Sequence, residues 1–342
     1  MDLSHRDAFV DFAHVGSTLK AMLGRDVDAP LVTIAIPTFR RPDKLVEVVK
    51  SAIAQDFDRP VEIIIVDNDP EDGAARAIVD SLPADPARPV RYYVNDQNIG
   101  MFGNWNRCIE LARGSWVTIL NDDDLLRPHF LKQSFRVLDR RTDIDGLVCR
   151  KPPYNWDTRR VEEKPIREAV KWLAFRWRFD RRNLLRATPR TLFFGNELDN
   201  GLGFLFKKEI AVAMGGYRPE EFPAADFFFY IRFCLEHNLY WFNKKLAYLG
   251  IGENESIRRS TITTSLNLGN DYYRTMTSGY VPASWIKLQP QLTANQLEAY
   301  RLKFGVTFDQ EERDAIETMI GAPLPPPSFG KVRRFRLFHG GY

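Results

Sequence analysis

Short apolar runs alternate with amphipathic segments over the first third of the chain. The runs at 31–36, 61–66, 90–94 and 116–120 are rich in Val, Ile, Leu and aromatic residues. Short runs of this kind are typical of strands buried in a parallel sheet. The segments between them have helical patterns. This alternation predicts an α/β fold with a mostly parallel, Rossmann-like sheet and helices on both faces.

The remaining pattern divides the chain into three parts. Residues 1–29 predict a leading helix, with Phe9 and Phe12 on its apolar side, that ends near Gly24. The α/β pattern extends to about 260, with a further strand predicted at 201–206. Residues 261–342 predict a helical extension with a basic tail.

Two segments mix aromatic and basic residues. The insertion at 151–195 interleaves Trp172, Phe175, Trp177 and Phe179 with arginines. An amphipathic helix beside a cleft or on anionic lipid is favoured over nucleic-acid binding, because the surrounding charge is balanced; an ordinary core helix is the alternative. The tail at 329–338 is consistent with a membrane surface, a disordered end or an oligomer contact.

Composition limits the classes of protein that remain. The net charge of +3 over 342 residues excludes a global attraction to nucleic acid. Three scattered cysteines suit a reducing compartment and cannot form a metal cluster alone. The first residues lack a secretory pattern, and no run of eighteen apolar residues occurs. We expect a cytoplasmic protein that at most contacts the inner face of a membrane.

Three adjacent carboxylates mark the candidate chemistry. Asp122, Asp123 and Asp124 follow Asn121 directly after the fourth predicted strand. Ligands bind at the carboxyl ends of strands in open α/β sheets. Adjacent carboxylates repel one another unless a cation compensates them, and hard oxygen ligands suit Mg²⁺ or Mn²⁺. The alternative is a solvated acidic turn in which Asp124 caps a helix.

The glycine fingerprints of other nucleotide folds are absent from the sequence. No strand is followed by Gly-x-Gly-x-x-Gly or by a P-loop motif. Polar residues follow the predicted strands instead, including Thr38, Asp67 and Asn98. This argues against a dinucleotide oxidoreductase and against a P-loop enzyme.

Five motifs in order then resemble glycosyltransferase family 2, which has the GT-A fold. They are Pro37-Thr38-Phe39-Arg40, Val66-Asp67-Asn68, Asn98-Ile99-Gly100, Asn121-Asp122-Asp123-Asp124, and Gly215-Gly216-Tyr217 followed by Asp226. The resemblance covers about residues 30–260. It implies a metal-dependent enzyme that moves a sugar, with inversion, from a nucleotide-diphosphate donor to an acceptor hydroxyl.

The resemblance implies a donor site in the first half of this domain. Pro37, Thr38 and Arg40 would contact the nucleotide after the first strand. Asp67 matches the carboxylate that accepts a hydrogen bond from N3–H of uracil, which favours a UDP-sugar because cytosine has no N3–H. Asn98 and Gly100 would shape the loop beside the base and ribose.

The acidic run matches the family's Asp-x-Asp motif in one of two registers. Asp122-x-Asp124 satisfies the pattern, but in the register of many relatives Asn121 replaces the first carboxylate. We expect Asp123 to bind Mn²⁺ or Mg²⁺ directly, Asn121 and Asp122 to face the sugar nucleotide, and Asp124 to contact or support the metal.

Asp226 is the candidate catalytic base, which would take the proton from the acceptor hydroxyl. Ala225 stands where relatives have an acidic residue, and Asp226 also suits the start of a helix. Arg232 matches a position that relatives often fill with arginine; it would pair with a carboxylate or reach the diphosphate. This chain has no histidine at 252–260, so Arg258 is the candidate to hold the leaving diphosphate.

The resemblance divides the domain into a nucleotide-sugar half at 30–150, the insertion at 151–195 and an acceptor half at 196–260. The expected acceptor is a glycan or a lipid-linked glycan in surface polysaccharide or glycoconjugate synthesis. Two alternatives remain. One is a non-catalytic relative that binds nucleotide sugar or glycan, and the other is a nucleotidyltransferase, although residues 37–42 contain no glycine for a triphosphate loop.

Overall fold

The computed structural model describes residues 3–71, 74–83, 86–162, 178–196, 198, 200–251 and 259–339. The strands are β1 (Ser17–Leu23), β2 (Val32–Thr38), β3 (Val61–Asp67), β4 (Val90–Asn95), β5 (Trp116–Ile119), β6 (Leu125–Leu126), β7 (Gly146–Arg150), β8 (Pro153–Asn155), β9 (Arg160–Val161), β10 (Leu184–Arg186), β11 (Phe204–Lys207), β12 (Leu239–Lys245) and β13 (Ala247–Ile251). The α-helices are α1 (Pro42–Ile53), α2 (Ala74–Asp80), α3 (Gly100–Leu111), α4 (Phe130–Leu138), α6 (Pro189–Leu192), α7 (Lys208–Ala213), α8 (Ala225–Glu236), α9 (Arg259–Thr277), α10 (Gln289–Phe304), α11 (Gln310–Ile320) and α12 (Phe329–His339). Short 3₁₀ helices are η1 (Phe9–Phe12), η3 (Pro219–Glu221) and η5 (Ala283–Leu288).

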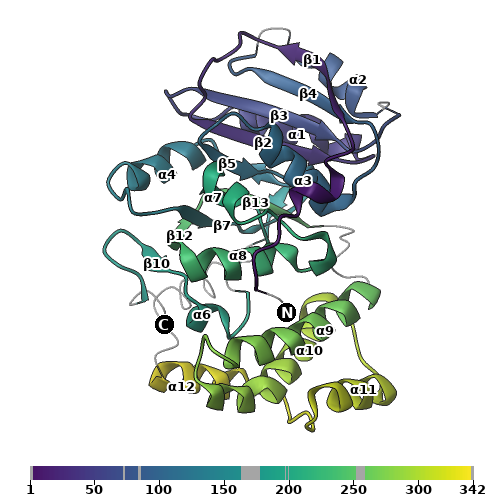
Figure 1. The fold of residues 1–342 in the computed structure, drawn as a ribbon, viewed down its shortest axis with the longest axis vertical. Coiled ribbons are helices and arrows are strands. Elements are labelled where there is room, and N and C mark those ends of the chain that lie inside the picture. Colours follow the sequence, from purple (N-terminus) through teal and green to yellow (C-terminus); the bar gives the residue numbers. More distant parts are fainter. Residues whose placement is uncertain are drawn as a thin grey trace.

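A nine-stranded sheet forms the centre of the described part of the chain, in the order β1-β4-β3-β2-β5-β11-β7-β12-β10 (Figure 1). The four strands predicted first, β2, β3, β4 and β5, are parallel to one another. Strand β11 joins β5 to β7 in antiparallel pairing, and β1 and β10 are antiparallel edges. The predicted α/β class and its mostly parallel central strands are confirmed.

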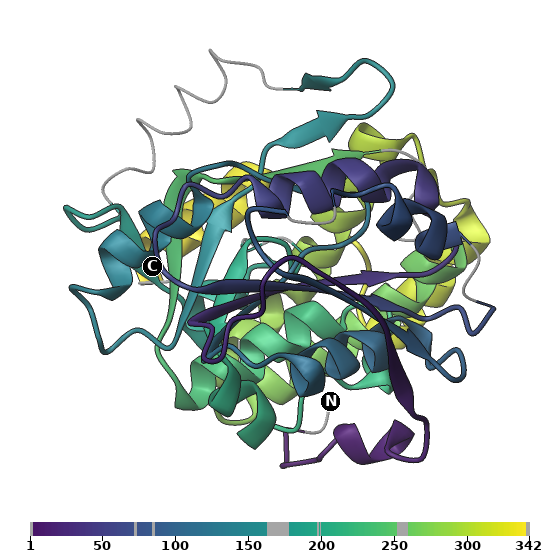
Figure 2. The same cartoon turned by 90° about the horizontal axis from the view of Figure 1, so that it is seen from above.

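Apolar residues on both faces of this sheet account for the layers. Helices α1 and α4 pack on one face through residues such as Leu45 and Phe130. Helices α3, α7 and α8 pack on the other face through residues such as Trp105 and Phe229. Figure 2 shows α1 and α3 on opposite sides of the strands. All seven residues of β3 are buried, which explains why this strand is mostly apolar in the sequence.

The predicted leading helix is wrong. Only η1 is helical there, and β1 follows it, antiparallel to β4 at the sheet edge. Ala21 and Leu23 pack on the core while Met22 between them is 39% exposed, which is the alternation of a strand. A register shift between Leu19 and Ala21 interrupts this alternation and hides it in the sequence.

The sequence pattern did not reveal a second, smaller sheet. It has the order β6-β13-β8-β9 and comes directly after the acidic run, because β6 begins at Leu125. Its strand β13 pairs with β6 and β8. The small sheet therefore lies next to the carboxylates that the sequence singled out.

The C-terminal helices pack on the same core as α8. Tyr272 of α9 contacts the ring of Phe227 at a centroid distance of 5.1 Å. Trp285 contacts Phe193 at 5.3 Å and Phe335 of α12 at 5.8 Å. The chain 259–339 is mostly helical, as predicted, and Figure 1 shows these helices beneath α8.

The basic tail buries part of its apolar side. Val332 and Arg336 of α12 are buried, and Phe335 is partly buried against the core, whereas Lys331, Arg333 and Arg334 are exposed. In the insertion, Phe179 packs on Trp241, while Trp172, Phe175, Arg176 and Trp177 lie outside the described residues. Within the described ranges, no helix has the length and apolar character needed to cross a bilayer.

A buried ion cluster holds the amino-terminal edge of the parallel strands together. Glu62 of β3 has no exposed surface and accepts hydrogen bonds from Thr33 of β2, Arg91 of β4 and Arg113 before β5, at 2.7–2.8 Å. One carboxylate thus links three neighbouring strands and the turn before a fourth.

We expect Glu62→Gln to lower the free energy of unfolding by about 3–5 kcal/mol, because it leaves two arginines without their buried counter-charge. Urea denaturation measures this. Asp139→Asn, which removes the exposed ion pair with Arg59, is the control and should change the free energy by about 0–1 kcal/mol. Equal effects of the two substitutions would show that the cluster does not hold the sheet.

Candidate active site

Two of the predicted polar residues end neighbouring strands in register. Thr38 is the last residue of β2 and lies opposite Asp67, the last residue of β3. The Thr38 hydroxyl donates to Asp122 Oδ2 at 2.9 Å, and the amide of Leu120 donates to Ala35 O of β2. The structure therefore places Thr38, Asp67 and the acidic run at one edge of the sheet.

Asp67 is held rigidly. Its side chain accepts hydrogen bonds from the Tyr92 hydroxyl at 2.9 Å and from the Asp69 amide at 3.0 Å, and only 2% of the residue is exposed. Each carboxylate oxygen has lone pairs for a further donor. This geometry is compatible with the predicted contact to a base.

A cluster of asparagines attaches the start of α3 to the end of β3. Asn68 donates to Asn98 Oδ1 at 2.8 Å and to the carbonyl of Gly100 at 3.2 Å, and it accepts from Asn95. Asn104 donates to the carbonyl of Val66 at 3.0 Å. Gly100 has φ +73°, a conformation that favours glycine. Asn98 and Gly100 therefore lie beside Asp67, as the strand order implies.

The three carboxylates of the acidic run are buried to different degrees. The side chains of Asp122 and Asp123 are 10% and 17% exposed. Burial, and then the charge of Asp123, raises the pKa of Asp122 to about 6. Burial also raises the pKa of Asp123 above its ordinary value. The run thus carries negative charge that water barely reaches.

Asp124 points away from solvent and into the protein. It is 1% exposed and accepts from the Gly250 amide at 2.9 Å and from Asn121 Nδ2 at 3.1 Å. Burial and the charge of Asp123 raise the pKa of Asp124 well above its ordinary value. These contacts favour support of the turn over direct contact with an ion.

Gly250 of β13 and Trp156, which directly follows β8, also hold the turn, and sequence reasoning missed both. Trp156 Nε1 donates to the carbonyl of Asp123 at 2.8 Å. A Cβ on Gly250 would lie 1.9 Å from that carbonyl oxygen, so any other residue would push the turn away. Neither residue carries a local motif that could have been recognised.

Arg41 is a third residue that sequence reasoning missed. Its Nη1 lies 3.5 Å from Asp123 Oδ2 and 3.9 Å from Asp122 Oδ1. The predicted Arg40 turns elsewhere, with φ +53° and an ion pair to Asp69 at 2.8 Å. A doublet of arginines in the sequence does not indicate which one faces the carboxylates.

The donor set of the acidic run fits a hard divalent cation. Asp122 and Asp123 offer carboxylate oxygens that are largely buried. Among the ion pairs of the described chain, only the half-exposed Arg41 compensates their charge. No group of three or more His, Cys, Asp and Glu that could hold a metal occurs in the described ranges. A cation here would need further ligands from the substrate, which is the usual way Mg²⁺ binds diphosphates.

Asp226 lies in the first turn of α8. Its Oδ1 accepts from the amide of Phe227 at 2.7 Å, and it is partly exposed. A Cβ on Gly201 would lie 4.0 Å from the Asp226 Cβ and 3.0 Å from Trp105 of α3. Burial and the charge of Asp226 raise the pKa of the Tyr217 phenol. Asp226 therefore lies near both Gly201 and Tyr217.

Arg232 forms a buried ion pair with Glu221, which is the first of the two contacts expected for it. Its Nη2 also donates to the carbonyl of Gly216 at 3.4 Å. The arginine thus braces the turn before α8. Arg258 and the rest of 252–258 lie outside the described residues.

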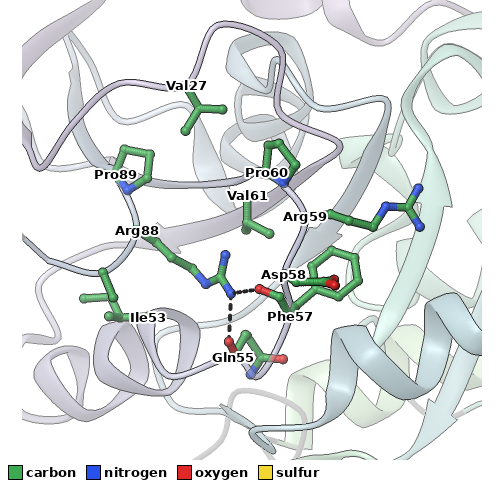
Figure 3. A pocket seen from close by; sticks show the side chains of 11 residues that line it. Val27, Ile53, Gln55, Phe57, Asp58, Arg59, Pro60, Val61, Arg88 and Pro89 are labelled. Carbon is green, nitrogen blue, oxygen red and sulfur yellow. Dashed lines mark hydrogen bonds between the residues drawn. The ribbon is translucent and has the colours of Figure 1, made fainter.

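A pocket of about 390 Å³ lies at the opposite edge of the sheet (Figure 3). Val61, the first residue of β3, lines it, whereas Asp67 is the last residue of that strand. Arg88 extends into it and donates to the carbonyls of Gln55 and Phe57 at 2.8 Å and 2.5 Å. This pocket contains none of the predicted site residues.

Known proteins are similar to this chain in part of its sequence and in its fold. Residues 33–198 match the model of a family described as Glycosyl transferase family 2. The chain is 36% identical over 110 residues to the succinoglycan biosynthesis protein ExoO of Rhizobium meliloti, which covers 32% of this chain and 30% of that protein. It is 37% identical over 99 residues to the GalNAc(5)-diNAcBac-PP-undecaprenol beta-1,3-glucosyltransferase of Campylobacter jejuni, covering 28% of this chain and 31% of that protein.

The fold is also that of a solved structure. The crystal structure of S. aureus TarS 1-349 in complex with UDP-GlcNAc superimposes with a TM-score of 0.59 at 14% identity, over 85% of this chain and 79% of that chain. At this identity the likeness shows the fold alone. The matches to the two curated relatives span about a third of each relative's length.

The raised pKa of Asp122 leads to a pH dependence of stability. The folded chain keeps the proton up to about pH 6, whereas the unfolded chain loses it near the ordinary value of about 4. The free energy of unfolding therefore falls between these two pH values, by about 3 kcal/mol for a shift of this size. We expect Asp122→Asn to stabilise the protein at pH 7–8 and to have little effect at pH 4.

Thermal unfolding at several pH values, without nucleotide or metal, measures this difference. Asp58→Asn is the control, because Asp58 is an exposed carboxylate. A stabilisation by Asp122→Asn that is the same at pH 4 and pH 8 would contradict the assigned shift.

Proposed function

Because the chain belongs to glycosyltransferase family 2 through residues 33–198, we propose that it transfers a sugar from a nucleoside-diphosphate donor to an acceptor hydroxyl. The observation that carries this proposal is the placement of Thr38, Asp67 and the acidic run at one sheet edge. The carboxyl ends of parallel strands are where open α/β sheets bind their ligands.

We propose a UDP-sugar as the donor. Asp67 presents a rigid acceptor at the sheet edge, which suits the N3–H of uracil and offers nothing to the corresponding acceptor atom of cytosine. The structural neighbour TarS has been solved with UDP-GlcNAc and with UDP, which supports the same nucleotide here. Asn98 and Gly100, beside Asp67, would line the base and ribose.

Mn²⁺ or Mg²⁺ is the proposed cofactor. Asp123 would hold the ion, and Asp122 would face the ribose and diphosphate together with Thr38. Asp124 would keep the turn in place through its buried contacts. When bound, such a cation neutralises the charge that develops on the leaving nucleoside diphosphate. Burial raises the pKa of Asp122 to about 6, and a bound cation would favour the ionised carboxylate.

Arg41 supplies a second positive charge at the same place. It is half-exposed and pairs with Asp122 and Asp123 through one nitrogen, so it can move without disturbing the fold. Arginine binds phosphate oxygens in a bidentate way. We propose that Arg41 pairs with the carboxylates before the donor binds and turns to the diphosphate when it binds.

Asp226 is the proposed catalytic base. A carboxylate there would take the proton from the acceptor hydroxyl as its oxygen attacks the anomeric carbon opposite the leaving group, which inverts the configuration. The turn of Gly215 and Gly216, with Arg232 and Glu221, holds the chain before α8. The proposed donor site therefore lies at the ends of β2 and β3, and the proposed base lies on α8.

A glycan or lipid-linked glycan in surface polysaccharide or glycoconjugate synthesis is the proposed acceptor. The names of the two curated relatives concern succinoglycan biosynthesis and an undecaprenol-linked glycan. The exposed Lys331, Arg333 and Arg334 of α12 give this chain a basic surface for contact with an anionic bilayer.

A thermal-shift panel of UDP, GDP, CDP and dTDP, each with Mn²⁺ or with EDTA, tests the donor site. We expect UDP with Mn²⁺ to raise the melting temperature, EDTA to abolish most of the shift, and Asp123→Asn to lose the metal-dependent part. Asp58→Asn is the matched control. Folded protein that no diphosphate stabilises would refute the donor site.

Substitution of Arg41 should separate nucleotide binding from metal binding. Loss of a charge-assisted hydrogen bond predicts about a tenfold weaker affinity of Arg41→Gln for UDP at saturating Mn²⁺. In the absence of nucleotide the same variant should bind Mn²⁺ more tightly, because a cation 3.5 Å from Asp123 is removed.

Titration calorimetry with Mn²⁺ alone and then with UDP measures both effects. The control is Arg59→Gln, an arginine whose ion pair with Asp139 lies at the opposite edge of the sheet. Unchanged affinities for both ligands in Arg41→Gln would mean that Arg41 has no part in the site.

A further inference from the structure

Asn106 in the middle of α3 binds the backbone of the turn that precedes α8. Its Nδ2 donates to the carbonyl of Tyr217 at 2.7 Å, and its Oδ1 accepts from the amide of the same residue at 2.8 Å. The side chain is 3% exposed. A primary amide is the side chain that both donates and accepts at this spacing, so the pair of bonds fixes the position of Tyr217 relative to α3.

The turn is shaped to receive this amide. Gly215 and Gly216 both have positive φ, at +76° and +72°, which places the Tyr217 backbone against α3. A Cβ on Gly216 would lie 2.5 Å from Asn106 Oδ1. The glycines and the asparagine are therefore parts of one contact.

The Tyr217 ring carries the contact onward to α8. It stacks on Phe229 at a centroid distance of 4.3 Å and an interplanar angle of 24°, and Trp105 of α3 meets it edge-on at 5.1 Å. Phe229 lies one helical turn after Asp226, whose charge acts on the Tyr217 phenol. The first turn of α8 thus rests on a ring that Asn106 anchors.

The other end of α3 is attached to the donor edge. Asn104, two residues before Asn106, donates to Val66 of β3, next to Asp67. Asn68 binds Gly100 at the start of the same helix. One rigid helix therefore connects the residues around Asp67 with the turn before Asp226.

We propose that Asn106 is a positioning residue, which sets Asp226 against the donor-binding edge through the Tyr217 backbone. This inference rests on the proposed function of Asp226. Misplacing a catalytic group by about 1 Å costs about 100-fold in rate. Asn106 touches neither proposed substrate, so its loss should act on turnover and leave donor binding intact.

The test compares Asn106→Ala with Gln55→Ala. Gln55 is the matched control, because it is also a buried amide that joins two segments through backbone hydrogen bonds, at the opposite edge of the sheet. With UDP-GlcNAc and Mn²⁺, release of UDP by hydrolysis reports turnover. We expect kcat to fall about 100-fold in Asn106→Ala, with KM and the thermal shift by UDP within twofold of the wild type.

Hydrogen exchange supplies a readout that does not depend on activity. Amides of 217–229 should exchange faster in Asn106→Ala and at the wild-type rate in Gln55→Ala. If Asn106→Ala does not fold, Asn106→Asp takes its place, because it keeps the size and the acceptor but loses the donor. We expect the same exchange pattern for it.

Unchanged exchange at 217–229 overturns the inference whether or not the wild type turns over UDP-GlcNAc. A rise in KM with unchanged kcat overturns it as well, because the residue would then act on binding. Suppose that exchange at 217–229 is faster in Asn106→Ala but the wild-type protein binds no nucleotide. This result supports the contact and refutes the proposed function instead.

Discussion

The candidate site is built around three neighbouring carboxylates that are buried at one edge of the sheet. Asp122, Asp123 and Asp124 lie largely out of contact with water, and burial raises the pKa of each of them. Thr38, the Gly250 amide and Arg41 compensate part of this cost. A stable turn does not need like charges there, and a bound cation would compensate them.

Two sheets cooperate to hold this charged turn. The large sheet supplies Thr38 and Asp67 from the ends of adjacent strands. The smaller sheet supplies Gly250, and the turn after its strand β8 supplies Trp156. Helix α3 then connects the edge to α8 through buried amides. Within the candidate site Arg41, Asn98 and Gly100 are exposed, and Asp226 is partly exposed.

Much of this arrangement was predictable. The mostly apolar runs of β2, β3, β4 and β5 identified the parallel core, since a strand covered on both faces is apolar at most of its positions. Their positions at the carboxyl ends of these strands then indicated that Thr38, Asp67 and the acidic run lie at the ligand-binding edge. The N-terminal segment was not predictable, because β1 is a half-exposed edge strand whose register shift breaks the alternation, and its pairing with β4 is a long-range contact.

The sequence by itself determined the α/β class, the family and the residues at the strand ends, because periodicity and strand-end chemistry are local properties of the chain. The tertiary structure alone decided which side chains contact the carboxylates and the turn before α8. Arg41 rather than Arg40 approaches the carboxylates, Asp124 turns inward to Gly250, and Asn106 holds Tyr217. These choices depend on contacts between segments more than eighty residues apart, which no local pattern encodes.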